Sequence, residues 1–159
     1  MSYTPQNFAP GQILTAEAMN AVETGIYDNA EDIDVLKSVT ADSGWITIAP
    51  GPNFLDYTDG EDPIYRKIGS VVTVSGVLKP ASSSVAINTG GSIVMFSLPI
   101  GFRPKFTVFV VCHGSGANRW LLTIFPNGNV CASRYGTDAY ASSVSGNEWM
   151  AFHAAFIAA

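Results

Sequence analysis

The sequence predicts a mainly β protein: an antiparallel, jelly-roll-like β-sandwich head preceded by one N-terminal α-helix. Two observations carry this prediction. From Gly44 onward, short apolar segments alternate with period two and are separated by turns rich in Gly, Pro, Ser and Asn. Between Met19 and Thr40, in contrast, apolar residues recur at helical spacing. Many short strands with no helix between them favour a sandwich or barrel, and an apolar content of 47% is ample for its core.

The chain is expected to have three regions. Residues 1–14 form an arm containing proline and glycine, residues 15–42 form a helical stem, and residues 43–159 form the head. Thr15 is a suitable N-cap, and Glu17 lies in the first helical turn, where an acid complements the helix dipole. We expect the helix to end near Val39, at the segment TADSG.

The helix carries a heptad pattern. Its a positions are Met19, Ile26, Ile33 and Thr40, and its d positions are Val22, Asn29 and Leu36. The apolar stripe is narrow, and this favours a coiled coil over the alternative, a helix lying on its own head. The expected oligomerisation residues are Met19, Val22, Ile26, Asn29, Ile33 and Leu36. Asn29 is interpreted as a residue that fixes register and stoichiometry, while Asp32 and Lys37 fall at g and e positions that pair between helices. Gly25 weakens the helix, so the stem is too short to hold the assembly alone.

Eight strands are predicted in the head, namely Trp45–Ala49, Tyr65–Ile68, Val71–Leu78, Ile93–Leu98, Phe106–Cys112, Arg119–Phe125, Val130–Arg134 and Glu148–Ile157. The segment FPNGNV is a two-residue hairpin pattern. The strands at 106–112 and 148–157 are apolar on both faces, whereas a strand in a solvated antiparallel sheet alternates with polar residues. The second apolar face predicts an interface between subunits.

Charge and cysteine content exclude several classes of protein. Up to Asp42 there are seven acids against one lysine, and afterwards six acids against seven bases, so the head has no basic stripe for nucleic acid. No apolar run is long enough to insert into a membrane, and the N-terminus lacks the pattern of a secretory signal. With Cys131 opposite Ile124 and Cys112 opposite Asn118, the two cysteines are too far apart for a disulfide and are expected as buried thiols.

Four segments carry a resemblance to a known family. YTPQNFAPGQILTAEAMNAVETGI resembles the start of tail and baseplate proteins from phages of Gram-positive bacteria. YRKIGSVVTVSGVL and SLPIGFRPK resemble phrases of phage receptor-binding heads, which also close on a Trp-containing strand such as NEWMAFHAAFI. The resemblance implies a homotrimer with a stem attached to the virion and a head that binds a cell-surface saccharide. The heptad residues alone do not choose three helices over two.

Saccharide binding requires an aromatic platform and planar hydrogen-bonding groups. Two clusters near loops supply them, and the expected saccharide-binding residues are His113, Asn118, Arg119 and Trp120, with Arg134, Tyr135, Asp138 and Tyr140. Trp120 has the alternative role of a core residue. Tyr135 and Tyr140 are expected in a loop rich in Gly and Ser, where a core role is less natural.

No catalytic residues, metal ligands or cofactors are expected. His153 is predicted as a packed side chain, whereas His113 opens a loop and is more accessible. A Ser–His–Asp triad is disfavoured because there is no nucleophile elbow. The acidic loop with Asp56, Asp59, Glu61 and Asp62 is interpreted as a solvated turn, and a glycosidase pair or a calcium site is its alternative role.

Taken with these observations, the resemblance implies a phage receptor-binding protein at the tail tip or baseplate, assembled in the bacterial cytoplasm and not an enzyme. Its expected partners are two further copies of itself, a host cell-wall polysaccharide and, through the N-terminal arm, other tail or baseplate proteins. The first alternative is a structural tail module that binds no saccharide. The second alternative is an enzyme that degrades cell-wall glycan.

Overall fold

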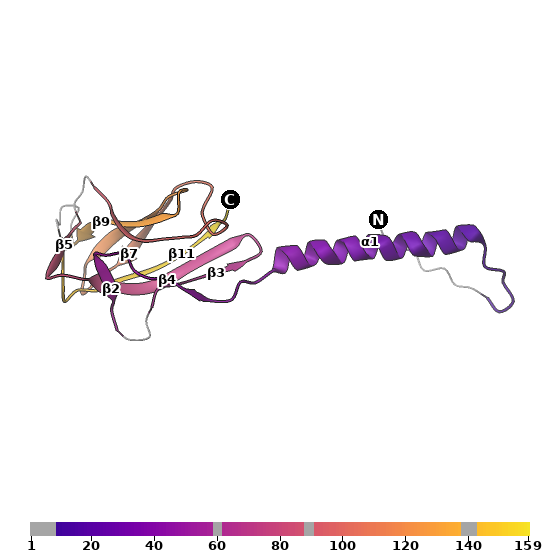
Figure 1. Ribbon diagram of the computed structural model, residues 1–159, viewed down its shortest axis with the longest axis horizontal. Coiled ribbons are helices and arrows are strands. Elements are labelled where there is room, and N and C mark those ends of the chain that lie inside the picture. The colour runs from indigo at the N-terminus through magenta and orange to yellow at the C-terminus, as the bar shows by residue number, and fades with distance from the viewer. Residues whose placement is uncertain (1–8, 59–61, 88–90, 138–142) are drawn as a thin grey trace. The chain divides into compact units, whose positions relative to one another are not determined.

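The computed structural model describes residues 9–58, 62–87, 91–137 and 143–159 (Figure 1). The chain divides into two compact units, Met1–Ala41 and Asp42–Ala159. Among the described residues, the first unit contains one α-helix, and the second, here called the head, contains the strands. None of the described helices is long and apolar enough to cross a membrane.

Helix α1 (Ala16–Thr40) begins where the sequence predicts. Thr15 has extended backbone angles, and its side-chain oxygen accepts a hydrogen bond from the Ala18 amide at 3.2 Å, as an N-cap does. Within Ala16–Thr40 no residue is buried, so the apolar side chains of the heptad pattern are uncovered in the single chain. Lys37 pairs with Asp34 at 3.3 Å within the helix, and both side chains are exposed. Such a pair contributes little to stability.

The head contains two larger antiparallel sheets and one small one. The first has the order β1 (Ile46–Thr47), β3 (Ile64–Ile68), β4 (Val71–Pro80) and β11 (Met150–Ile157), with β2 (Phe54–Asp56) also pairing with β4. The second has the order β6 (Ile93–Ser97), β9 (Asn129–Gly136), β8 (Arg119–Ile124) and β7 (Val108–His113). The small sheet pairs β5 (Ser84–Ala86) with β10 (Ser143–Ser145). The mainly β, antiparallel fold predicted from the sequence is therefore confirmed.

The two larger sheets enclose one hydrophobic core. Val72 and Val74 of β4 lie in the same buried cluster as Leu122 and Ile124 of β8. Phe152 of β11 links the sheets directly, because its ring lies 5.4 Å from that of Phe96 and 6.4 Å from that of Trp120. These contacts fix the second sheet, which carries the candidate site, against the first.

Strand alternation places half of each apolar strand outside. On β11 the residues from Met150 to Phe156 alternate between buried and more exposed positions, and Ile157 is 59% exposed. On β7 the outward residues Phe109 and Val111 are 64% and 72% exposed. The prediction that His153 is packed is wrong: its side chain is exposed because it alternates with the buried Phe152 and Ala154.

Turn geometry corrects the predicted register. In the β8–β9 hairpin the Phe125 amide donates to Asn129 and the Gly128 amide donates to Phe125, so three residues form the loop instead of two. Gly128 has φ +95, as in a turn that ends in a bulge.

Because of these turns, Cys131 pairs with Thr123 and Cys112 with Trp120, instead of with Ile124 and Asn118. Both cysteines are free and buried, as predicted. Burial raises the pKa of the Cys112 thiol to about 11, which keeps it protonated and unreactive at neutral pH.

Candidate ligand-binding site

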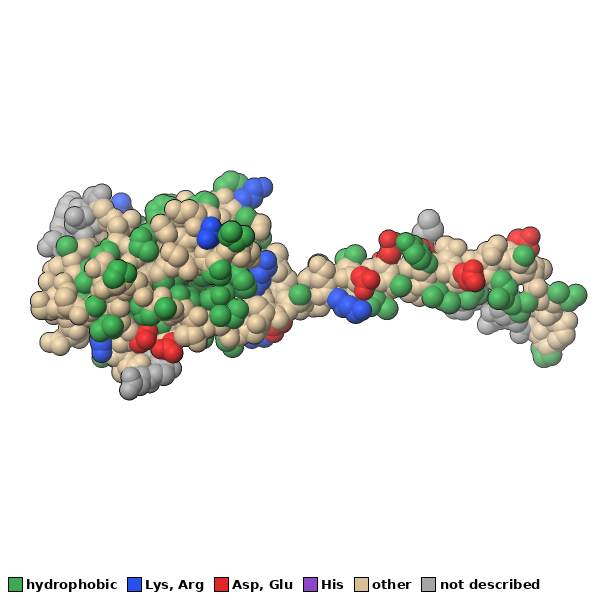
Figure 2. Space-filling view, in the orientation of Figure 1, with side chains coloured by type: hydrophobic (Ala, Val, Ile, Leu, Met, Phe, Trp, Pro, Cys, Tyr) green, Lys and Arg blue, Asp and Glu red, His purple; other side chains and the backbone are tan. Residues whose placement is uncertain are grey.

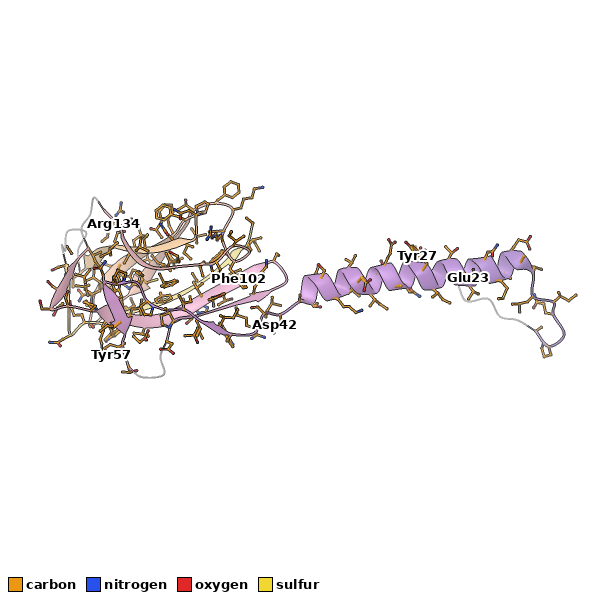
Figure 3. The ribbon with its side chains drawn as sticks, viewed as in Figure 1. Glu23, Tyr27, Asp42, Tyr57, Phe102 and Arg134 are labelled. Carbon is orange, nitrogen blue, oxygen red and sulfur yellow. The ribbon has the colours of Figure 1, made fainter. Side chains whose placement is uncertain are left out.

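A pocket of about 250 Å³ lies on the outer face of the second sheet. Val111 of β7 and Leu121 of β8 supply aliphatic surface, and Arg119 and Arg134 supply charge. The remaining lining residues are Trp120, Gly136 and Thr137. The pocket lies at the end of the head away from Asp42, the head's first residue, and Figure 3 labels Arg134 at that end. Apolar walls with a few polar groups are typical of a small-molecule site.

A β-bulge directs Arg134 to the outside of the sheet. Arg119 pairs with Gly136 and Leu121 pairs with Ser133, so two residues of β9 face the single Trp120 of β8. Arg134 has φ +57 and is the one non-glycine residue with positive φ in the described part of the chain. The extra residue turns Arg134 outward, whereas its neighbour Tyr135 is buried.

The two aromatic residues expected as platforms belong to the core. Trp120 is 1% exposed, and its indole nitrogen donates to the His113 carbonyl at 3.1 Å. Tyr135 is 2% exposed and belongs to β9, so the expectation that it lies in an exposed loop is wrong. Burial raises the pKa of the Tyr135 hydroxyl, although a hydrogen bond with Asn118 opposes the shift. No local pattern indicated this burial, because Tyr135 is followed directly by loop-forming residues.

A polar network holds the β7–β8 hairpin in place beside the pocket. The Asn118 amide nitrogen contacts the Tyr135 hydroxyl at 3.3 Å and donates to Glu148 Oε1 at 3.0 Å. The Ser145 amide donates to Glu148 Oε2 at 2.7 Å, so the carboxylate also fixes the turn before β11. Trp149 completes the network, because its amide donates to Ser115 Oγ at 2.7 Å. Asn118 therefore positions the hairpin, and its amide is committed to partners within the chain.

The structure thus separates the predicted saccharide-binding residues into groups. Arg119, Trp120 and Arg134 line one pocket, although only the arginines offer exposed side chains there. His113 is exposed on the neighbouring hairpin, where its ring lies 5.8 Å from that of Trp149. Asp138 and Tyr140 lie outside the described residues.

Sequence reasoning missed Val111, Leu121, Gly136 and Thr137 as lining residues and Ser115, Glu148 and Trp149 as supporting residues. The signal that could have identified Val111 and Leu121 is their place at outward apolar positions of the predicted strands 106–112 and 119–125. No sequence pattern indicated the hydrogen bond between Glu148 and Asn118, since the two residues are 30 positions apart in the sequence.

In the acidic loop the structure describes Asp56 and Asp62, and the Asp56 Oδ1 atom is buried without a hydrogen-bond partner among the described residues. Burial raises the pKa of Asp56, and the neighbouring carboxyl group of Asp62 raises it further. Asp59 and Glu61 lie outside the described residues. Within the described part of the chain, no three His, Cys, Asp or Glu side chains gather as a metal site.

The arrangement of one helix followed by antiparallel sheets has a counterpart among phage receptor-binding proteins. The chain is similar to the receptor binding protein (gp15) of Listeria phage PSA, with a TM-score of 0.50 and 14% sequence identity. The likeness covers 91% of this chain and 81% of that one. No protein-family model and no curated protein matches the sequence. The likeness shows the fold, and it confirms the resemblance to a phage receptor-binding protein that the sequence carries.

Proposed function

We propose that the chain is a receptor-binding protein of a phage tail tip or baseplate, whose head binds a cell-wall saccharide of the host. Residues 15–42 act as a coiled-coil stem that joins three copies, and residues 1–14 attach the trimer to other tail or baseplate proteins. Residues 43–159 act as the jelly-roll-like head. The protein assembles in the bacterial cytoplasm and functions on the virion.

The observation that carries this proposal is the pocket beside the β7–β8 hairpin, on a fold shared with a phage receptor-binding protein. Its charged rim and aliphatic walls suit a sugar unit, which presents hydroxyl groups at its edge and C–H groups on its face. The network around Asn118 and Glu148 supports the binding surface by holding the adjacent hairpin rigid.

Exposed apolar residues support the association of copies. Met19, Ile26, Ile33 and Leu36 are all about half exposed or more in the single chain, although they occupy heptad core positions. In the head, Phe109 of β7 and Ile157 of β11 are also uncovered apolar side chains, and Figure 2 shows hydrophobic side chains on the surface of both units. Three heads per trimer raise the avidity of weak individual sites without further contacts.

The proposal is tested by measuring binding of the purified full chain to cell walls and to a glycan array. Light scattering should give about three times the chain mass of 16.8 kDa. Retention of the trimer on walls and on isolated wall polysaccharide, together with release of bound protein by that polysaccharide, is the expected result. A monomer at micromolar concentration would overturn the trimer.

The exposed apolar surface of β7 also favours a second candidate, a tail scaffold module that binds other tail proteins and no saccharide. Absence of binding across a wide range of walls and glycans, with trimer formation intact, would favour the scaffold. Release of reducing ends from wall polysaccharide would instead identify a glycan-degrading enzyme.

A further inference from the structure

We propose that the pocket binds an anionic group of its ligand, a phosphate or a carboxylate carried by a sugar unit, through Arg119 and Arg134. This inference rests on the proposed receptor-binding function and specifies the chemistry of the ligand. It places charge recognition on residues of two adjacent strands and places apolar contact on Val111 and Leu121.

The first support is that two arginine side chains line one small pocket. Arg119 and Arg134 are both exposed, and both line a space of about 250 Å³. Arginine stays charged at any physiological pH, and two like charges at one site repel each other. An anion relieves this repulsion, and the planar guanidinium matches the oxygens of a phosphate or carboxylate in paired hydrogen bonds.

The second support is the backbone of Arg134. Its φ of +57 lies in the left-handed region, which glycine enters freely and a side chain enters at a cost. The bulge at this position directs Arg134 outward, to the rim of the pocket. Backbone strain of this kind clusters at binding sites, where it aims a functional side chain.

The third support is the composition of the rest of the lining. Among the described residues, no carboxylate lines the pocket. The Arg119 guanidinium donates to the Thr137 carbonyl at 3.4 Å, a long contact that orients the group at the rim. The aliphatic surfaces of Val111 and Leu121 suit the C–H face of a sugar ring, and the volume fits one small unit because larger ligands occupy ~300–1,000 Å³.

A titration with three probes of one ring type tests the pocket directly. Glucose, glucose 6-phosphate and glucuronate are added to the full chain, and the side-chain Nε–H resonances of Arg119 and Arg134 are followed by NMR. We expect glucose 6-phosphate or glucuronate to shift both resonances, with the shifts weakening as salt is added, and glucose to leave them unchanged. Equal shifts with neutral glucose, or none with either anion, would overturn the inference.

Variants then connect the pocket with binding to the natural polymer. Arg119→Gln and Arg134→Gly should each weaken binding to wall polysaccharide by about tenfold or more, since each removes a charge-assisted hydrogen bond. Arg134→Gly retains the positive φ, so loss of the fold does not explain its effect. Lys105→Gln is the matched control, because it removes the same charge from an exposed side chain outside the pocket and should leave binding unchanged. Equal loss in the control would indicate attraction by net charge alone and would overturn the assignment.

Chemical treatment of the polymer identifies the anion and separates the two proposals. Hydrofluoric acid removes phosphodiester groups, and carbodiimide activation followed by borohydride reduction removes carboxylates. Loss of binding after only the first treatment identifies a phosphate as the bound group, and loss after only the second identifies a carboxylate. Full binding after both treatments would overturn the anionic ligand and leave the receptor-binding function standing. If the untreated walls bind nothing, the receptor-binding function fails, and the probe titration still decides whether the pocket takes an anion.

Discussion

The helix and the head differ in how far their apolar side chains are buried. In the head, Val72, Leu78 and Leu122 are fully buried by side chains of the same chain. In helix α1, Ile26 and Leu36 remain 64% and 59% exposed, and no residue between Ala16 and Thr40 is buried. An apolar stripe without a partner has no stabilising burial, so the helix gains none within the single chain, whereas the head has its own core.

The head itself carries both kinds of surface. The inward residues of β7 pack on the core, whereas Phe109 and Val111 on its other face are uncovered in the single chain. The outer face of β7 thus resembles the helix more than it resembles the core. A variant in the core should change the folding of the head, and a variant in the heptad pattern should change only assembly.

The largest expected effect is the loss of stability when a core side chain is shortened. Leu122→Ala leaves a cavity at a fully buried site and should lower the free energy of unfolding by about 2–5 kcal/mol. Urea unfolding followed by tryptophan fluorescence measures it. Leu36→Ala is the matched control in the helix and should leave the urea midpoint of the head unchanged while weakening assembly in light scattering. Equal destabilisation of the head by both variants would contradict the division of roles.

The next effect concerns the turn that fixes the second sheet. A Cβ on Gly128 would lie 2.4 Å from the Leu98 carbonyl oxygen and 2.6 Å from Arg103 Nε, and the residue has φ +95. Gly128→Ala should therefore destabilise the head by more than the ~1–2 kcal/mol cost of a left-handed residue. Gly116→Ala provides the comparison, because Gly116 has φ +64 with open space around it and should lose only the conformational part. Similar losses in thermal unfolding would show that the Leu98 and Arg103 contacts relax.

A smaller effect is expected at Asn29, the polar residue among the heptad positions. Asn29→Leu should raise the thermal stability of the assembly by a few degrees, since leucine at a d position buries more apolar surface. The same change should broaden the stoichiometry, because an amide in the heptad core favours one alignment. Asn20→Leu, on the outer face, serves as the control and should alter neither property. Circular dichroism measures the thermal stability of both variants, and light scattering measures their stoichiometry. A single sharp trimer mass for Asn29→Leu would contradict the proposed role of Asn29 in fixing register and stoichiometry.

Periodicity predicted the helix and the long strands because each has enough residues to show its period. The structure adds β2, β5 and β10, which have three residues each and include serine or aspartate beside one or two apolar residues. Three residues are too few for an alternation to be visible, and pairing with distant strands determines them. Strand β11, in contrast, was predicted nearly to its observed bounds, because its eight residues alternate regularly between buried and more exposed positions.

The candidate site was predictable only in part. Adjacent strands brought Arg119 and Arg134 to one pocket, as their positions in neighbouring segments indicated. The burial of Trp120 and Tyr135 follows from the bulge and from the facing sheet, and neither has a local sequence pattern. The register depends on one extra residue in β9, and the register decides which side chains face solvent. The burial of Trp120 and Tyr135 was therefore not predictable from the sequence alone.

The smallest expected effect is a pH dependence at the start of the head. Asp42 accepts hydrogen bonds from Arg66 and from the Gly44 amide, and these bonds lower the pKa of its carboxyl group to about 2. A lowered pKa in the folded state stabilises the head at pH values above the ordinary value of 3.8, and this contribution disappears as pH falls toward 2. Because both side chains are partly exposed, salt should weaken the contribution.

Asp42→Asn tests this assignment by difference. The free energy of unfolding of the variant should fall below that of the unaltered chain by a constant amount above about pH 5, and the gap should close between pH 4 and pH 2. Subtracting the two curves removes the titration of every other carboxyl group, including Asp56, whose pKa is shifted upward. A gap that persists unchanged at pH 2 would mean that Asp42 acts through its backbone position beside Ile68, and that its charge contributes nothing.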